Sequence, residues 1–184
     1  MQREEVLDLI RGHRPFDAQE AESSAAAKAF LEEHENFWQR DNYVGHLTAS
    51  AWVVNPRRSH VLLTHHKKLD LWLQLGGHLE AEDITLLQGA LREAKEESGI
   101  QTIKANQSSI FDIGHHPISV PKEPPHVHYD IRFLLTAYDT DFSVSEESHD
   151  AGWFALEDIP TISSSTALPR MAKKLQTGWY ENHT

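Results

Sequence analysis

The sequence contains no cysteine, which excludes disulfide bonds and metal sites built from thiolates. A chain of this kind is compatible with a reducing compartment, and we expect a cytoplasmic protein. No apolar run reaches the length that spans a bilayer, and the start MQREEVLDLI is too charged for a secretory signal. We therefore expect no membrane partner.

Positive charge is scarce relative to negative charge. The 184 residues include 17 Lys and Arg against 28 Asp and Glu, which gives a formal net charge of −11. Without a basic excess the surface has little to neutralise a phosphate backbone, so we expect no nucleic-acid partner. Repeats are lacking as well, and the length suits one sizeable core.

The order of local patterns indicates two parts. Residues 1–40 are expected to form an N-terminal helical extension, with helices at 4–11 and 18–33 separated by Pro15. Residues 41–184 form the expected main domain. Its predicted strands are residues 46–54, 60–64, 71–75, 109–113, 129–138 and 152–155, and its predicted closing helix is 167–179. Strands around a central helix, with more helices outside, predict an α/β sandwich.

The central helix carries three acidic residues on one face. Glu93, Glu96 and Glu97 stand at i, i+3 and i+4, within an arc of about 100°. Carboxylates packed this closely raise one another's pKa unless a cation lies among them. Oxygen ligands favour a hard divalent ion such as Mg²⁺ or Mn²⁺, so the pattern indicates a metal site. The alternative is a solvated acidic helix face.

The surroundings of these acids favour a docked helix. Apolar residues between 87 and 94 recur at i, i+3, i+4 and i+7, a pattern typical of a helix that lies on a core. Thr85 and Gln88 have the spacing of a capping box, and Gly99 fits a helix stop. The acids border the apolar stripe, so we expect them at the edge of the core.

The segment Gly77–Ile100 resembles the Nudix box, whose pattern is G-x5-E-x7-R-E-U-x-E-E-x-G-U with U aliphatic. Its helical half, REAKEESGI, matches almost letter for letter, and only Ala94 is smaller than usual. The half before the helix contains one extra residue. Either Glu82 or Asp83 therefore takes the place of the usual loop glutamate, and the sequence leaves this choice open.

The resemblance implies a Nudix-like α/β/α sandwich around a mixed β-sheet. It also implies Mg²⁺- or Mn²⁺-dependent hydrolysis, by metal-activated water, of a nucleoside diphosphate linked to another moiety. The expected metal ligands are Glu93, Glu96, Glu97 and the carbonyl group of Gly77. Arg92 is expected to orient a carboxylate within the catalytic group.

Histidine is abundant, with 13 residues. His78 directly follows Gly76 and Gly77, and these three residues are expected to form a turn that binds the phosphates of the substrate. His126 and His128 share one face of an extended segment. Imidazole pairs of this kind can bind Zn²⁺, Mn²⁺ or Ni²⁺. The alternative is that such histidines are hydrogen-bonded core residues or contact the substrate.

A further acid is expected downstream of the box. The stretch SEESHDAGWFALEDI resembles the segment where many Nudix proteins place another catalytic acid before a Trp-Phe pair. We assign this role to Glu147, with Glu146 and Asp150 as neighbouring alternatives. Glu93 and Glu147 are the candidates for the general base, and the sequence does not decide between them.

Other functions are compatible with parts of the same resemblance. Isopentenyl diphosphate isomerases share a Nudix-like fold and use histidine and glutamate around a metal, but they rely on a cysteine that this chain lacks. A non-catalytic Nudix-like module that binds a nucleotide or a protein typically loses box acids, whereas Arg92, Glu93, Glu96 and Glu97 are present. Many relatives dimerise, so a homodimer is one open oligomeric state.

Overall fold

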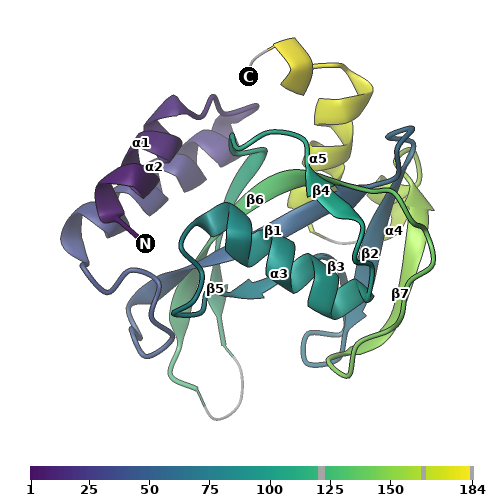
Figure 1. Cartoon of the computed structure of the whole chain (residues 1–184). Coiled ribbons are helices and arrows are strands. Elements are labelled where there is room, and N and C mark those ends of the chain that lie inside the picture. The colour runs from purple at the N-terminus through teal and green to yellow at the C-terminus, as the bar shows by residue number, and fades with distance from the viewer. Residues whose placement is uncertain (120–122, 163–164, 183–184) are drawn as a thin grey trace.

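The computed structural model describes residues 1–119, 123–162 and 165–182, and within them a mixed seven-stranded sheet lies between helices (Figure 1). The strands are β1 (Gly45–Val54), β2 (His60–His66), β3 (Leu71–His78), β4 (Ile103–Ala105), β5 (Asp112–Ile118), β6 (His126–Ala137) and β7 (Ser148–Ala155). The helices are α1 (Arg3–Gly12), α2 (Ala18–Glu33), α3 (Leu86–Ser98), α4 (Ile159–Ile162) and α5 (Ala167–Gln176), with a 3₁₀ turn at Tyr180–Asn182.

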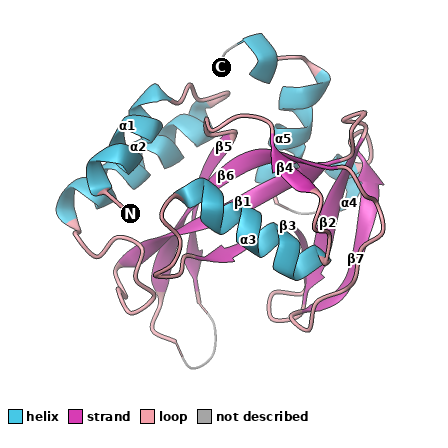
Figure 2. Ribbon diagram, in the orientation of Figure 1, coloured by secondary structure: helices cyan, strands magenta, loops and turns pink. Residues whose placement is uncertain are grey.

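The sheet has the order β4-β6-β1-β3-β2-β7, and β5 also pairs with β6. Strands β1 and β6 are parallel, whereas the other pairs are antiparallel. Alternate side chains of β1 enter two separate cores. Leu47 and Ala49 pack in the core that includes α1, α2 and α3, while Trp52 and Val54 pack with α4 and α5. Helices therefore cover both faces (Figure 2), and the predicted α/β/α sandwich around a mixed sheet is confirmed.

The central helix α3 begins and ends as its sequence predicts. The Thr85 hydroxyl accepts a hydrogen bond from the Gln88 amide, and the Gln88 side chain accepts one from the Thr85 amide, which completes the capping box. Gly99 ends the helix in the left-handed region, with φ of 72°. Ala90 and Ala94 are fully buried against the sheet. The two small residues let the helix lie close to β1 and β3.

The prediction of a turn at Gly76 and Gly77 is wrong. Gly76 and Gly77 lie inside β3, which continues to His78 and pairs with β1 through Ser50–Gly76 and Ala49–Gly77. Gly76 has φ of 142°, and a Cβ atom there would lie 2.5 Å from the Cα atom of Ser50. Gly76 thus allows β3 to approach β1 closely, because a side chain at this position would collide with the backbone of β1.

Several boundaries also differ from those expected. The strand predicted at 109–113 begins at Asp112, and those predicted at 129–138 and 152–155 begin earlier, at His126 and Ser148. The closing helix ends at Gln176. Strand β4 and helix α4 were not predicted, since three or four residues carry too little periodicity to be recognised.

Helices α1 and α2 share the core on their side of the sheet with α3, and buried ion pairs of Lys174 connect α5 to both α2 and β5. A division into an extension and a domain at residue 40 stays a prediction, as do the cytoplasmic location and the oligomeric state. Among the described residues, no helix has the length and apolar character needed to cross a membrane.

Candidate active site

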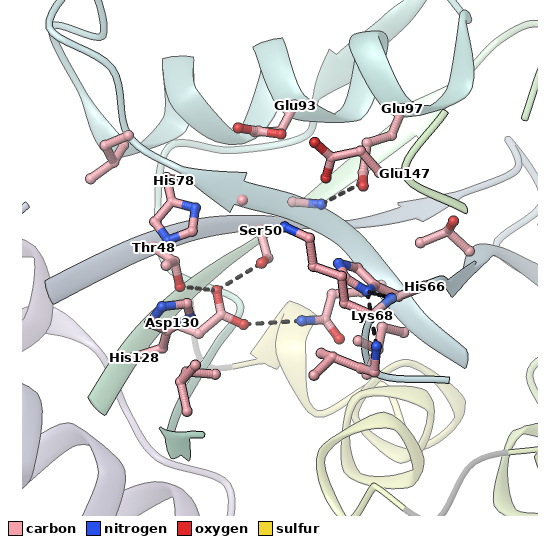
Figure 3. A pocket seen from close by; sticks show the side chains of 18 of the residues that line it. Thr48, Ser50, His66, Lys68, His78, Glu93, Glu97, His128, Asp130 and Glu147 are labelled. Atoms are coloured by element: carbon pink, nitrogen blue, oxygen red, sulfur yellow. Dashed lines mark hydrogen bonds between the residues drawn. The ribbon is translucent and has the colours of Figure 1, made fainter. Parts of the chain in front are cut away.

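A cavity of about 440 Å³ opens between α3, the middle strands and the segment before β7 (Figure 3). The carboxylates of Glu93 and Glu97 point into it from α3, and the side chain of Glu147 lies beside that of Glu97. Below β3, the cavity is lined by polar side chains of the sheet. These include Thr48, Ser50, Gln74, His78, His116, His128 and Asp130.

Arg92 joins the helix acids to the segment before the helix. Its guanidinium donates hydrogen bonds to Asp83 Oδ2 at 2.9 Å, to Glu93 Oε1 and Glu96 Oε2 at 3.0 Å each, and to the His78 carbonyl at 2.9 Å. The hydrogen bond with Asp83 and the charge of Glu93 raise the pKa of Arg92 despite its partial burial. Five donors in a planar fork allow this multiple contact, which a lysine could not make.

Asp83 occupies the acidic loop position that the sequence left open. Its side chain is buried, accepts a hydrogen bond from the Glu80 amide at 2.9 Å and pairs with Arg92, whereas Glu82 is exposed. The extra residue of the segment therefore lies between Asp83 and Arg92, where the capped start of α3 accommodates it. The shorter aspartate still reaches the guanidinium because the chain turns back at Glu80–Asp83.

The acids of α3 repel one another in the cavity. Glu97 accepts a hydrogen bond from the Gly76 amide at 2.8 Å, yet burial and the charges of Glu93 and Glu147 raise its pKa to about 8. Burial also raises the pKa of Glu93, although Arg92 opposes this change. A cation between these carboxylates would relieve their repulsion, and their oxygen atoms suit a hard divalent ion.

Gly77 lies directly beneath the carboxylate of Glu93. A Cβ atom on Gly77 would be 2.8 Å from Glu93 Oε1, so the absence of a side chain makes room for this carboxylate. The arrangement brings the backbone of β3 within reach of the same acids. The residues present therefore fit the Mg²⁺ or Mn²⁺ site that the Nudix resemblance implies, with oxygen donors only. Glu96 is the most exposed of the three helix acids and contacts Arg92.

The segment before β7 contributes Glu147 to the cavity, as the sequence suggested. Its charge acts on both Glu93 and Glu97. Glu146 and Asp150 do not line the cavity within the described residues; the Asp150 carboxylate accepts a hydrogen bond from the Ala151 amide.

His78 lies at the end of β3 in a group of histidines. Burial, the charge of Arg40 and the neighbouring imidazoles lower the pKa of His78 to about 3, so its side chain is neutral at pH 7. Its ring centre lies 5.1 Å from that of His46 and 5.0 Å from that of His128. His78 was expected on a phosphate-facing turn, but the structure places it on a strand that lines the cavity.

The sequence analysis missed a buried polar network on the floor of the cavity. Asp130 accepts hydrogen bonds from Ser50 at 2.7 Å, Thr48 at 3.1 Å, Gln74 at 3.0 Å and Arg132 at 2.7 Å. A signal was available, because polar residues alternate with apolar ones along two strands that are otherwise buried. In HLTAS and HVHYDIR, every second residue is polar, and period-two spacing places these side chains on one face.

Comparison with known proteins supports a single family. The NUDIX domain model matches residues 45–176. A Nudix-family hydrolase from Clostridium perfringens is 26% identical over 72% of this chain and 97% of its own, with a TM-score of 0.54. An Ap4A hydrolase of C. elegans, solved as a binary complex, is 18% identical over 72% of this chain and 96% of its own, with a TM-score of 0.55.

A third similar structure is the MutT protein of Methanosarcina mazei Go1, which is 20% identical over 78% of this chain and 99% of its own, with a TM-score of 0.53. A search of curated proteins returned no match. The domain model covers well over half of the sequence and includes α3 with its acids and the segment of Glu147. The chain therefore belongs to the Nudix hydrolase family.

Proposed function

We propose that this Nudix-type pyrophosphohydrolase cleaves the diphosphate linkage of a nucleoside diphosphate linked to another moiety, with Mg²⁺ or Mn²⁺ as its cofactor. The observation that carries the proposal is the meeting of Glu93, Glu97 and Glu147 in one cavity, where the raised pKa values of Glu93 and Glu97 and the mutual repulsion of the three carboxylates call for a cation. The products would be a nucleoside monophosphate and a phosphorylated remainder.

Glu93, Glu96, Glu97 and the Gly77 carbonyl would hold the divalent ion. When bound, the ion screens the negative oxygens of the diphosphate and lowers the pKa of water at the site. Arg92 is a positioning residue in this scheme. It contacts Glu93 and Glu96, and it binds the His78 carbonyl at the end of β3, so it keeps the helix and the strand in register around the cavity.

Glu147 is the general base in this proposal. Glu97 is held by the Gly76 amide and Glu93 by Arg92, whereas the Glu147 carboxylate has no hydrogen bond or ion pair within the described residues. An exposed, unpaired carboxylate beside the other acids can accept the proton of the attacking water. His78, neutral at pH 7, can donate one hydrogen bond to a phosphate oxygen.

The base assignment is tested by Glu147→Gln, with Glu146→Gln as the matched control from the same segment. We expect Glu147→Gln to lower kcat by roughly 10²- to 10⁴-fold, the usual contribution of general base catalysis, while Mg²⁺ binding stays near the wild-type level. Equal activity of the two variants would return the role to Glu93.

The reaction itself is tested with a panel of diphosphates in Mg²⁺ or Mn²⁺. The panel contains nucleoside triphosphates, ADP-ribose, dinucleoside polyphosphates, NADH and nucleotide sugars, and each is incubated with the wild-type chain and with Glu96→Gln/Glu97→Gln. We expect turnover of one class by the wild type and loss of that turnover in the folded variant. A fully active variant, or a folded wild type that binds metal and hydrolyses nothing in the panel, would contradict the proposal and favour a binding module.

A further inference from the structure

Four strands bring histidines together, three of them on the floor of the cavity and His46 buried next to them. In the parallel pair of β1 and β6, His46 lies opposite His128, and in the antiparallel pair of β5 and β6, His116 lies opposite His128. His78 on β3 lies opposite Thr48, two residues along from His46. The strand register therefore places these imidazoles side by side, and this arrangement does not depend on the acids of α3.

His46 is the buried member of the group. It is only 1% exposed, and its Nδ1 atom lies 3.4 Å from the Asn42 carbonyl. A carbonyl only accepts, so Nδ1 carries the proton and Nε2 keeps its lone pair. That Nε2 atom is buried and has no hydrogen-bond partner. An unpaired buried lone pair is costly in a folded protein, so this atom favours a partner.

The neighbouring imidazoles lie close to the His46 ring. The ring centres of His78 and His128 lie 5.1 Å and 4.7 Å from that of His46. One potential ligand atom each from His46, His78 and His128 lies within 4.8 Å of the other two. His126 donates from Nδ1 to the Pro124 carbonyl at 2.9 Å, and its Nε2 atom lies 3.0 Å from His128 Nε2. His126 therefore holds His128 by a second contact, as residues behind metal ligands commonly do.

We propose that His46, His78 and His128 form a second metal site, made of histidine alone, which binds a borderline divalent ion of the Zn²⁺ class. Nitrogen ligands favour Zn²⁺ over Mg²⁺, so this site selects a different ion from the carboxylates of α3. Nitrogen atoms around a tetrahedral zinc are about 3.4 Å apart, so the rings close by roughly 1.5 Å at most. His78 and His128 are only partly buried and can make this movement.

Three protein ligands leave the fourth position of a tetrahedral ion open. Since His78 and His128 line the same cavity as the acids of α3, that position faces the space where an anionic ligand would lie. The ion would add positive charge to the cavity on the side of the sheet, apart from the carboxylates of α3. A phosphate oxygen has the negative charge that such an ion would attract.

The test uses Co²⁺ as the probe, on the full metal-stripped chain without a histidine tag. Tetrahedral Co²⁺ absorbs visible light much more strongly than octahedral Co²⁺ at an oxygen site, so the spectrum separates the two sites without an activity assay. Four proteins are titrated: the wild type, Glu96→Gln/Glu97→Gln, His46→Gln/His128→Gln, and the control His65→Gln/His149→Gln. The control removes a pair of imidazoles in ring contact at 5.5 Å that lies outside the cluster.

We expect one equivalent of strongly absorbing Co²⁺, displaced by Zn²⁺ but not by Mg²⁺, in the wild type, the control and the glutamine variant of α3. The band disappears in His46→Gln/His128→Gln. Because His46 is buried, the partly exposed His78→Gln is measured as well, and it must weaken Co²⁺ binding at least tenfold. A band that survives both histidine variants, or one that is lost in Glu96→Gln/Glu97→Gln, would overturn the proposal.

Discussion

Arg92 connects the two parts of the active site, the helix α3 and the segment before it. It binds the buried Asp83, two helix acids and the carbonyl at the end of β3. Nη1 donates to the two helix acids, and Nη2 donates to Asp83 and to the carbonyl at the end of β3. A guanidinium is required because an ammonium group has neither the reach nor the fixed angles to make these contacts together.

We therefore expect Arg92→Lys to lower kcat by roughly 10²-fold, since a small displacement of positioned groups is enough for such a loss. KM changes less, because Arg92 contacts the carboxylates and not the substrate. Steady-state kinetics with the substrate found in the panel provide the measurement. Arg11→Lys, in an exposed ion pair with Asp8, is the matched control and keeps wild-type kinetics. A rise in KM alone would show instead that Arg92 binds substrate.

The acids of α3 predict a response of the stability to Mg²⁺. Glu93, Glu96 and Glu97 repel one another, so an ion that binds only the folded state relieves this repulsion and stabilises the fold. At an Mg²⁺ concentration about 100-fold above its Kd, the free energy of unfolding rises by roughly 2.7 kcal/mol. That corresponds to a thermal midpoint about 5–10 °C higher for a chain of this length.

Differential scanning calorimetry with and without Mg²⁺ measures this shift. Glu96→Gln/Glu97→Gln carries fewer charges in the cluster, so it gains stability in the absence of metal and responds little to Mg²⁺. If the variant and the wild type respond equally, the ion binds elsewhere.

At the scale of elements, the crossing of β3 beneath α3 determines the geometry of the site. Two adjacent glycines in β3 serve different purposes. Gly76 has φ of 142°, and a Cβ atom there would meet the backbone of Ser50, which cannot move without the strand. A Cβ atom on Gly77 would meet the end of the Glu93 side chain, which can turn away.

Alanine at the two positions should therefore separate stability from activity. Gly77→Ala is expected to cost less than about 1 kcal/mol of stability while it lowers kcat roughly 10²-fold, because it displaces Glu93. Gly76→Ala is expected to cost about 1–3 kcal/mol, the usual range for a strained backbone. Urea unfolding and initial rates measure the two effects. Gly12→Ala, where a Cβ atom has no neighbour within 4 Å, should change neither. Equal loss of stability in both β3 variants would contradict this separation.

The sequence predicted α3 well and the sheet less well. The helix has a capping box, an apolar stripe and a glycine stop, and all three signals are local, so its bounds could be derived from neighbours in the chain. Strand pairing joins distant segments. The polar alternation of β1 and β6 was visible, but which residues face one another depends on a parallel register that no local pattern encodes. The Asp130 network and the full histidine group were missed for this reason.

The turn predicted at Gly76 and Gly77 was wrong for a related reason. Two glycines in a row favour a turn when only the local chain is considered. Their actual function depends on Ser50 and Glu93, which lie on other elements and require the close approach. The sequence did place Glu93, Glu97 and Glu147 together as candidates, because the box motif includes the two helix acids and the downstream segment resembles the one that supplies a further acid, and the structure brings these residues into one cavity.

For the whole molecule, a buried charge network joins the N-terminal helices to the rest. Asp112 on β5 accepts hydrogen bonds from Arg132, Arg170 and Lys174, and Lys174 also binds Glu20 of α2 at 2.6 Å. All these charges are removed from water, and each is compensated only while its partners are in place. Helix α2 is therefore fixed to the sheet by charge as well as by its apolar face.

Asp112→Asn should destabilise the protein strongly, by about 3–5 kcal/mol at neutral pH, because it leaves buried cations without their counter-charge. The cost also depends on pH. Burial alone would raise the pKa of Asp112, but the hydrogen bond from Arg170 and the charges of Lys174 and Arg132 outweigh burial and lower it. A lowered pKa contributes stability that is fully present above the unfolded value of 3.8 and is lost as the pH falls further, towards the folded pKa.

The difference in unfolding free energy between the wild type and Asp112→Asn is thus constant above a pH of about 5 and shrinks below about 4. Urea unfolding of both proteins across this range gives the measurement. Asp8→Asn, which alters an exposed pair with Arg11, is the control and stays within about 0.5 kcal/mol of the wild type throughout. A difference that grows as the pH falls would mean that Asp112 is protonated in the folded protein, because only then would the wild type bind its extra proton before it unfolds.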